Sequence, residues 1–163
     1  MKRGIAVEIP GFGRLALELL ATDYTGTLSH GGKLNAATEQ RILLLSDLVD
    51  IHILTADTLG TAARELGHLP VTIHRLEPAQ QDEQKREFLS ALDPARVAAL
   101  GNGNNDRLLL GAVKQAGGLA IAVDNGEGCA VETLLRANLF ITGIENALDL
   151  LLETGRLKAT LRF

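Results

Sequence analysis

Asp23-Tyr24-Thr25-Gly26-Thr27 is the stretch from which the fold of this chain can be read. It directly follows residues 14–22, an alternating run that predicts a β-strand leading into the core. Asp23 then stands where a strand ends, and the small residues after it let the backbone bend around a bound anion. In open α/β sheets, ligands bind beyond the carboxyl ends of the strands. On these residues alone two interpretations are open: a site carboxylate, or an Asp that only starts a turn.

Composition limits the class of protein. The 163 residues suit one domain spanning 1–163, and a hydrophobic content of 46% is enough for a full core. A net charge of −4 gives no indication of a nucleic-acid or membrane partner. The single cysteine, Cys129, excludes an internal disulfide framework and fits a reducing compartment. With no signal-like N-terminus and no apolar stretch long enough to span a bilayer, we expect a soluble, cytoplasmic protein.

Strands and helices alternate on either side of the opening stretch. Residues 5–9 predict a first strand, and Pro10-Gly11-Phe12-Gly13 turns the chain into the strand at 14–22, which together predict an N-terminal β-hairpin. Further strands are predicted at 51–54, 71–74, 96–100, 119–123 and 139–142. Six helices are predicted. They run from after Asn35 to about 48, from after 55–58 to about 66, over 78–92, over 108–116, from after 124–128 to about 136, and over 144–152. This alternation predicts an α/β fold with a mainly parallel sheet covered on both faces.

Two segments fall outside this alternation. Residues 28–34 contain the pair Gly31-Gly32, which predicts a short flap or hairpin over the site. Residues 155–163 alternate apolar with basic or polar side chains. They could form an added strand or an oligomer contact, and a solvated tail is an equal alternative.

Polar side chains recur where the predicted strands end. Asp23 ends one strand, Thr55 another, and Asn102 with Asp106 a third, while Lys85 comes from the helix before that third strand. In a parallel sheet these ends converge on one edge. Acid and amide oxygens suit Mg²⁺, whereas a lysine and a hydroxyl suit phosphate oxygens. The set therefore predicts a phosphoryl group bound together with Mg²⁺.

Four ordered motifs make the chain resemble the haloacid dehalogenase (HAD) superfamily. Residues 23–27 resemble the phosphorylation motif Asp-Lys-Thr-Gly-Thr of P-type ATPases, which belong to that superfamily. Residues 54–57, Leu-Thr-Ala-Asp, resemble the second motif, and Lys85 stands where the third motif has its lysine. Residues 101–106, Gly-Asn-Gly-Asn-Asn-Asp, resemble the fourth motif, Gly-Asp-Gly-x-Asn-Asp. The likeness covers nearly the whole chain and is greatest to small soluble proteins compared with the phosphorylation domain of P-type ATPases.

This resemblance implies a fold and a reaction. The fold is a HAD-like Rossmannoid three-layer α/β/α sandwich, and the reaction is that of a Mg²⁺-dependent phosphatase or phosphohydrolase that forms an aspartyl-phosphate on Asp23. The implied catalytic residues are Asp23, Thr25, Thr55 and Lys85. The implied substrate-binding residues are Tyr24, Thr55, Ala56 and Lys85. The implied Mg²⁺ ligands are Asp23, the Thr25 carbonyl, Asn102 and Asp106, although Asp106 has the alternative role of orienting Lys85 or a metal-bound water.

Two departures from the family pattern point to weak chemistry. Thr25 stands where most HAD phosphatases carry an acid–base Asp, and loss of such help typically costs about 10²–10⁴-fold. We therefore expect slow turnover, or substrates with good leaving groups. Asn102 replaces the usual Asp and removes one negative charge from the metal site. The alternative to an enzyme is therefore a HAD-fold regulatory or binding module.

The short connections between the motifs leave no room for a large cap domain. Such an open site suits a large substrate, and the partner that we expect is a small phosphorylated metabolite or a phosphoprotein. The open site also suits closure by a neighbouring subunit, so a homo-oligomer, dimer or tetramer, is expected by analogy with capless phosphatases of the superfamily.

Other candidate residues have simpler structural interpretations. The histidines lack metal-ligand spacing and are expected to be structural, with substrate contact as an alternative for the one in the flap; they are His30, His52, His68 and His74. Cys129 is expected to pack rather than to act as a thiolate, and Asp57 to cap a helix. A loop role, with substrate or metal contact as the alternative, is expected for Asp124, Asn125 and Glu127.

Overall fold

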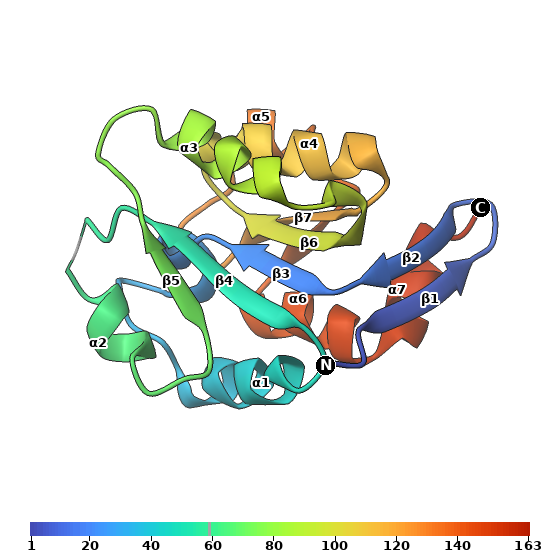
Figure 1. The fold of residues 1–163 in the computed structure, drawn as a ribbon, viewed down its shortest axis with the longest axis horizontal. Helices are drawn as coiled ribbons and strands as arrows, with labels where there is room; N and C mark the ends of the chain where they lie inside the picture. The colour runs from blue at the N-terminus through green and yellow to red at the C-terminus, as the bar shows by residue number, and fades with distance from the viewer. Residues whose placement is uncertain (59) are drawn as a thin grey trace.

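Six strands form one parallel sheet at the centre of the computed structural model, which describes residues 1–58 and 60–163 (Figure 1). Every neighbouring pair in this sheet is parallel. In order across the sheet the strands are β5 (Thr72–Arg75), β4 (Asp50–Thr55), β3 (Leu19–Thr22), β6 (Val97–Gly101), β7 (Leu119–Asp124) and β8 (Leu139–Thr142). The predicted parallel α/β sheet is confirmed.

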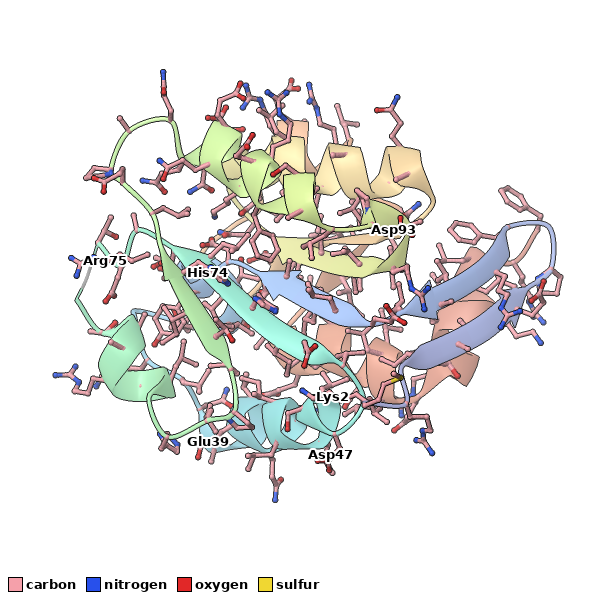
Figure 2. The ribbon with its side chains drawn as sticks, viewed as in Figure 1. Lys2, Glu39, Asp47, His74, Arg75 and Asp93 are labelled. Atoms are coloured by element: carbon pink, nitrogen blue, oxygen red, sulfur yellow. The ribbon has the colours of Figure 1, made fainter. Side chains whose placement is uncertain are left out.

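Helices cover both faces of the sheet, so the fold has three layers (Figure 1). The helices are α1 (Ala36–Ser46), α2 (Ala62–Leu66), α3 (Gln81–Glu87), α4 (Arg107–Ala116), α5 (Val131–Leu134), α6 (Ile144–Leu152) and α7 (Thr154–Leu161). Successive residues of β3 point to opposite faces, as in any strand. Leu20 therefore joins the core packed against α1 and α6, whereas Leu19 and Ala21 join the core beneath α4. Charged side chains such as Asp47 and Asp93 lie on the outside (Figure 2).

The predicted strand at 14–22 is divided between two sheets. β2 (Gly13–Leu17) pairs antiparallel with β1 (Ile5–Ile9) in the predicted N-terminal hairpin, whereas β3 belongs to the central sheet. The chain changes partners at Glu18, whose N–H donates to the Arg96 carbonyl (2.8 Å) and whose carbonyl accepts from the Asp50 N–H (3.0 Å). Alternation of side chains continues through this point, so the sequence pattern alone did not reveal the change of sheet.

The segment between β3 and α1 follows the prediction closely. A compact turn (Tyr24–Leu28), in which Thr25 and Gly26 have non-helical dihedral angles, leads into the flap. There His30 and Lys33 exchange two backbone hydrogen bonds of 3.1 Å each. Gly31 and Gly32 have φ values of 60° and 78°, a conformation that favours glycine. Asn35 then caps α1, because its side chain accepts from the Thr38 N–H at 2.8 Å.

One predicted element is wrong, and another begins later than predicted. Residues 155–163 do not form a strand or a solvated tail, since most of them belong to α7, in which Leu157 and Leu161 share a face four residues apart and pack into the core beside the hairpin. The helix predicted from Pro78 begins at Gln81 instead and follows Gln80, which has a left-handed φ of 53°. In the described part of the chain, no helix combines the length and apolarity that a membrane span needs.

Candidate active site

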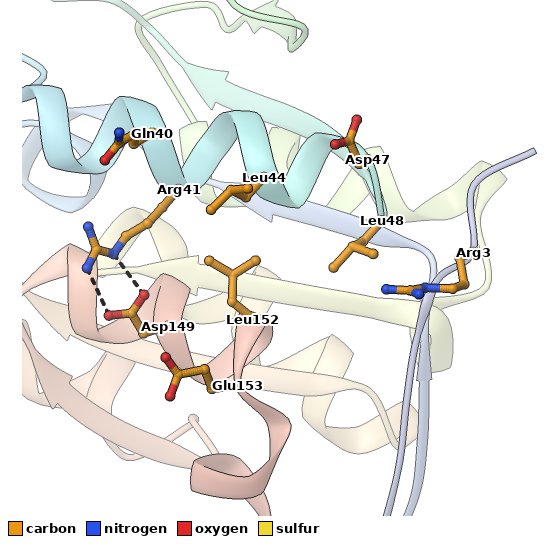
Figure 3. Close-up of a pocket in the computed structure, with 9 residues that line it drawn as sticks. All are labelled: Arg3, Gln40, Arg41, Leu44, Asp47, Leu48, Asp149, Leu152 and Glu153. Atoms are coloured by element: carbon orange, nitrogen blue, oxygen red, sulfur yellow. Dashed lines mark hydrogen bonds and ion pairs between the residues drawn. The ribbon is translucent and has the colours of Figure 1, made fainter.

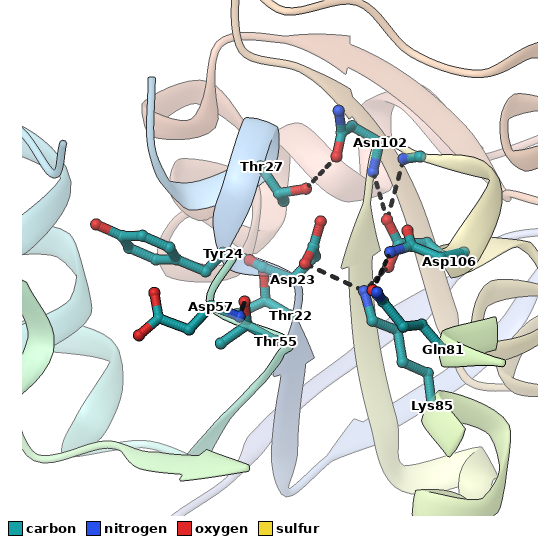
Figure 4. Close-up of polar contacts among 12 residues, drawn as sticks. Thr22, Asp23, Tyr24, Thr27, Thr55, Asp57, Gln81, Lys85, Asn102 and Asp106 are labelled. Atoms are coloured by element: carbon teal, nitrogen blue, oxygen red, sulfur yellow. Dashed lines mark hydrogen bonds and ion pairs between the residues drawn. The ribbon is translucent and has the colours of Figure 1, made fainter. Parts of the chain in front are cut away.

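The ends of three adjacent strands, β4, β3 and β6, bring the predicted site residues together (Figure 4). Thr22 is in register with Ile53 on one side and Leu100 on the other. Asp23 follows Thr22 and its N–H donates to the Leu100 carbonyl at 3.2 Å. Register therefore places the carboxylate of Asp23 between the second and fourth motifs, at the edge where α/β sheets bind ligands.

Lys85 is the buried cation of the site. Its ammonium lies 3.1 Å from Asp23 Oδ1 and 2.7 Å from Asp106 Oδ1 (Figure 4). The Lys85 side chain is fully buried, so water does not solvate its ammonium group. Two carboxylates within contact distance supply the compensating charge that a buried ammonium requires. The helix α3 thus delivers one positive charge to the floor of the site.

The pKa values reflect this crowding of charges. Burial, together with the charge of Asp106, raises the pKa of Asp23 to about 7, although Lys85 opposes the shift. For Lys85, burial lowers the pKa, but Asp106 and Asp23 outweigh it and the net direction is upward. Lys85 therefore remains charged at neutral pH, while Asp23 titrates near neutrality in the metal-free protein.

Asp106 organises the loop of the fourth motif. Its Oδ2 accepts from the backbone N–H groups of Asn102 and Gly103, both at 3.0 Å, while its Oδ1 accepts from Lys85. A Cβ at Gly101 would lie 2.4 Å from the Asp106 side chain, so only glycine fits at this point. Asp106 therefore orients Lys85 and holds the fourth-motif loop, while its predicted role as a metal ligand stays a prediction.

Thr55 presents a fixed hydroxyl to the same edge. Its Oγ1 accepts from the Asp57 N–H at 3.0 Å, which leaves the hydroxyl proton free to donate to a phosphate oxygen. Asp57 in turn accepts from the Ala62 N–H at 2.9 Å, so it satisfies the start of α2 as predicted. Asp57 holds this position in a left-handed conformation, with φ of 50°.

A cavity of about 320 Å³ opens over these groups. Its lining consists of Asp23, Thr25, Thr55, Ala56, Asp57, Thr58, Gln81, Asn102, Gly103 and Asn105. Sequence reasoning did not single out Gln81 or Asn105. A usable signal for Gln81 was its spacing, because residues four apart share a helix face and Gln81 precedes Lys85 by one turn.

Three predicted site residues, Tyr24, Lys85 and Asp106, are not among the lining residues of this cavity. Lys85 and Asp106 are buried beneath it beside Asp23, whereas Tyr24 belongs to the core. Tyr24 is fully buried and its hydroxyl donates to the Gly32 carbonyl at 2.8 Å, which ties the compact turn to the flap. The Tyr24 side chain therefore packs in the core instead of lining the cavity.

The donor set fits a hard divalent cation such as Mg²⁺. Asp23, Thr25 and Asn102 line one cavity and offer a carboxylate, a backbone carbonyl and an amide oxygen, and Mg²⁺ sites commonly use one or two carboxylates plus substrate phosphate. Asn102 is held in place by Thr27, whose hydroxyl donates to Asn102 Oδ1 at 3.0 Å. A Cβ at Gly26 would lie 2.6 Å from Asn102 Nδ2. Within the described residues, no cluster of three His, Cys, Asp or Glu side chains offers an alternative metal site.

The other candidate residues have structural contacts. His52 Nδ1 and His74 Nε2 lie 2.8 Å apart beneath Phe88, and His68 pairs with Glu39. His30 contacts the Asn125 carbonyl at 2.9 Å and so joins the flap to the loop after β7. The Asp124 carboxylate accepts from the Gly126 and Gly128 N–H groups, and burial raises the pKa of the Cys129 thiol. These contacts agree with loop and packing roles.

A larger cavity of about 580 Å³ lies away from the motifs, between α1, α6 and the N-terminal segment (Figure 3). Arg41 Nε and Nη2 donate to the Asp149 carboxylate there, at 2.8 and 3.1 Å, so that both groups are occupied with each other. Leu44, Leu48 and Leu152 provide apolar walls. Size alone therefore does not locate the chemistry, because the smaller cavity holds the convergent reactive groups.

Proton release is expected to govern metal binding at Asp23. Its pKa, raised to about 7, means that below this pH a proton occupies the carboxylate that a metal would need. Apparent Mg²⁺ affinity should therefore rise about tenfold per pH unit up to pH 7 and level off above it. Calorimetric titration of the metal-free protein between pH 5.5 and 8.5 measures this, with Asp23→Asn as control. An affinity independent of pH across this range would contradict the prediction.

Comparison with solved structures defines the class of fold. A HAD superfamily (subfamily III A) hydrolase structure from Legionella pneumophila is 17% identical with a TM-score of 0.63, over 89% of this chain and 86% of that one. Deoxy-D-mannose-octulosonate 8-phosphate phosphatase from Haemophilus influenzae, in a cobalt-bound form, is 13% identical with a TM-score of 0.62. The match covers 90% of this chain and 89% of that one. The corresponding phosphatase from Moraxella catarrhalis, in complex with magnesium, phosphate and the sugar acid, is 19% identical with a TM-score of 0.60. The match covers 90% of this chain and 94% of that one. The chain has the fold of the HAD hydrolases, as the motifs predicted.

Sequence comparison adds a relative. No protein-family model matches the chain. Uncharacterized protein MJ0073 from Methanocaldococcus jannaschii is 48% identical over 67 residues, which are 41% of this chain and 68% of the archaeal protein. The chain belongs to the same family as this archaeal protein.

Proposed function

We propose that this chain is a Mg²⁺-dependent phosphatase that acts through an aspartyl-phosphate on Asp23. The observation that carries the proposal is the position of Lys85, whose buried ammonium bridges Asp23 and Asp106 at the strand edge. A nucleophile beside a fixed cation is the arrangement that phosphoryl transfer needs, because the charge of the transferring group must be balanced. The HAD fold of the solved phosphatases supports the same conclusion.

The residues divide the reaction between them. Asp23 Oδ attacks phosphorus, the bond from phosphorus to the leaving oxygen breaks, and that oxygen takes a proton from water. Water then attacks the aspartyl-phosphate and regenerates the carboxylate with release of inorganic phosphate. Lys85 and the Thr55 hydroxyl bind the phosphoryl oxygens throughout. When bound at Asp23, the Thr25 carbonyl and Asn102, Mg²⁺ would supply further charge neutralisation.

The test of this function is phosphate release from an aryl phosphate with Mg²⁺, compared between the wild-type chain and Asp23→Asn. A second candidate function is a HAD-fold binding module, which the neutral residues Thr25 and Asn102 in the cavity favour. It predicts no turnover across a panel of phosphate esters, even at high Mg²⁺, together with retained binding of a partner. Turnover that depends on Asp23 would exclude it.

Thr25→Asp is expected to accelerate turnover. Thr25 lines the cavity two residues after Asp23, so a carboxylic acid there would protonate the leaving group and activate water. We expect about a tenfold gain in kcat on an aryl phosphate, below the roughly 10²–10⁴-fold typical of acid–base catalysis because the site is not otherwise adapted to it. Steady-state rates of Thr25→Asp and its neutral control Thr25→Asn decide this. Equal rates for the two variants would show that another step, such as metal binding, is limiting.

The partners follow from the site. We propose a small phosphorylated metabolite or a phosphoprotein as the substrate, and a homo-oligomer in which a neighbouring subunit covers the open site. The open cavity supports both proposals. The single cysteine supports a reducing compartment such as the cytoplasm.

A further inference from the structure

A second hollow adjoins the site cavity and shares a wall with it. This outer hollow has a volume of about 330 Å³ and lies where α3 begins, against the loop of the fourth motif. Gln81 and Asn105 line both hollows, so their side chains form the boundary between them. Each hollow lies at the small end of the range for ligand pockets, about 300–1,000 Å³, so the two together offer room for a phosphoryl group and an attached leaving group.

The boundary consists of two primary amides held against each other. Asn105 Nδ2 donates to Gln81 Oε1 at 2.9 Å, and Gln81 Nε2 donates to the Pro78 carbonyl at 3.1 Å. A primary amide has two donor hydrogens and an oxygen with two lone pairs, so this pair retains capacity for further hydrogen bonds of both kinds. Hydroxyl groups, which donate and accept, match such a surface.

The charges of the two linings disfavour a second anionic group. Among the lining residues that the structure describes, Arg107 is the one cation, and its guanidinium is paired with Asp82 at 2.6 Å. Lys85, beneath the cavity, is already shared by Asp23 and Asp106. Asp57 adds a further carboxylate to the inner lining. A leaving group that carried its own carboxylate or phosphate would therefore meet uncompensated negative charge.

The described linings also contain no aromatic ring. A nucleotide base is commonly bound by stacking on an aromatic side chain, and an extended apolar group needs apolar walls. Along this path there is no ring for stacking, and the only apolar side chains among the described lining residues are the small ones of Ala56 and Pro78. The other lining side chains are amides, hydroxyls, carboxylates and one guanidinium. Both non-glycine residues with a positive φ in the described chain, Asp57 and Gln80, line these hollows, which is where backbone strain commonly marks function.

We propose that the two hollows form one substrate groove for the phosphate monoester of an uncharged, hydroxyl-rich compound, a polyol or a neutral sugar. Gln81 and Asn105 bind hydroxyls of the leaving group, while the phosphoryl group occupies the inner cavity at Asp23. This assignment rests on the proposed phosphatase function and names the substrate class of the same site. Gln81 and Asn105 are specificity-determining residues here and take no part in the bond exchange.

Two probes that differ only in charge at the far end test the class. Sorbitol 6-phosphate and 6-phosphogluconate share a polyhydroxylated chain, but the second ends in a carboxylate. We expect the wild-type chain, assayed with Mg²⁺, to show a kcat/KM at least about tenfold higher for sorbitol 6-phosphate. Equal values, or a preference for 6-phosphogluconate, would overturn the proposed substrate class.

The variant Gln81→Leu tests the amide pair, and Gln115→Leu on the exposed surface of α4 is its matched control. We expect Gln81→Leu to lower the ratio of kcat/KM for sorbitol 6-phosphate to that for an aryl phosphate about tenfold, because the proposed contact between the Gln81 amide and a substrate hydroxyl is lost. The control should keep this ratio, and both variants should retain the unfolding temperature, since leucine suits a helix. An unchanged ratio in Gln81→Leu overturns the role of the pair.

The outcomes separate this inference from the function on which it rests. Hydrolysis of the aryl phosphate that depends on Asp23, without discrimination between the two polyol-derived probes, overturns the substrate class and leaves the phosphatase proposal standing. Failure of the wild-type chain to hydrolyse any of the three esters overturns both.

Discussion

Asp23→Asn should abolish phosphatase activity, lowering kcat by at least about 10³-fold, because an amide oxygen is a poor nucleophile and forms no stable phosphoryl adduct. The reason lies in the geometry of the site: Asp23 is the carboxylate at the end of the central strand that faces the cavity and contacts the buried Lys85. Rates of phosphate release from an aryl phosphate with saturating Mg²⁺ measure the loss.

Asp47→Asn is the matched control, since it makes the same chemical change at an exposed position at the C-terminal end of α1, outside the lining of the site cavity (Figure 2). It should keep full activity. Beryllofluoride with Mg²⁺ gives a second readout, because it mimics a phosphorylated carboxylate. We expect it to raise the unfolding temperature of the wild-type chain and of Asp47→Asn, but not of Asp23→Asn. Residual turnover in Asp23→Asn within tenfold of wild type would remove Asp23 from the mechanism.

Lys85→Met should cost about 3–5 kcal/mol of unfolding free energy at pH 8, besides removing activity. The substitution keeps a similar length but leaves two carboxylates, Asp23 and Asp106, buried beside each other without their cation. Removal of one partner from a buried ionic group leaves uncompensated charge, which costs far more than the loss of a surface ion pair. Urea unfolding of Lys85→Met and of the exposed control Lys158→Met measures the difference.

The sign of the pH dependence makes this prediction specific. A carboxyl whose folded pKa is raised favours the folded state at low pH, and that contribution is lost as pH rises from the unfolded value of 3.8 through about 7. Without Lys85, the like charges repel more strongly above this window, so the stability loss in Lys85→Met should be smaller at pH 5 than at pH 8. Adding Asp23→Asn to Lys85→Met should recover a large part of the loss at pH 8. The same cost at both pH values would argue against a charge effect.

The sequence predicted the parallel sheet and the residues at the ends of its strands, because both follow from local patterns of residue type. Apolar runs of strand length between helical patterns are typical of buried parallel strands, and they recur at 119–124 and 139–142 where the structure has β7 and β8. Asp23, Thr55 and Asn102 lie at one edge because parallel strands end on the same side, whereas Lys85 reaches that edge from helix α3. The Asn35 cap was readable from the type of residue before α1.

Other features depended on contacts that no local pattern records. The alternation of residues 14–22 is the same whether the chain pairs with one sheet or two, and only the partners of Glu18 divide it. The alternation of residues 155–163 suggested a strand, but the apolar face of the hairpin needed cover, and a helix with Leu157 buried supplies it. Gln81 and Asn105 met across the site because α3 packs beside the fourth motif.

The sequence by itself therefore determined the fold class and the residues that carry charge and nucleophilicity, since these follow from residue type and strand position. Only the tertiary structure decided which of those groups pair with one another and which of them are buried. It placed the ammonium of Lys85 between Asp23 and Asp106, engaged both oxygens of Asp106, and turned Tyr24 away from the cavity. The physical reason is that burial and pairing of charges depend on which distant segments approach one another, and this is a property of packing rather than of spacing along the chain.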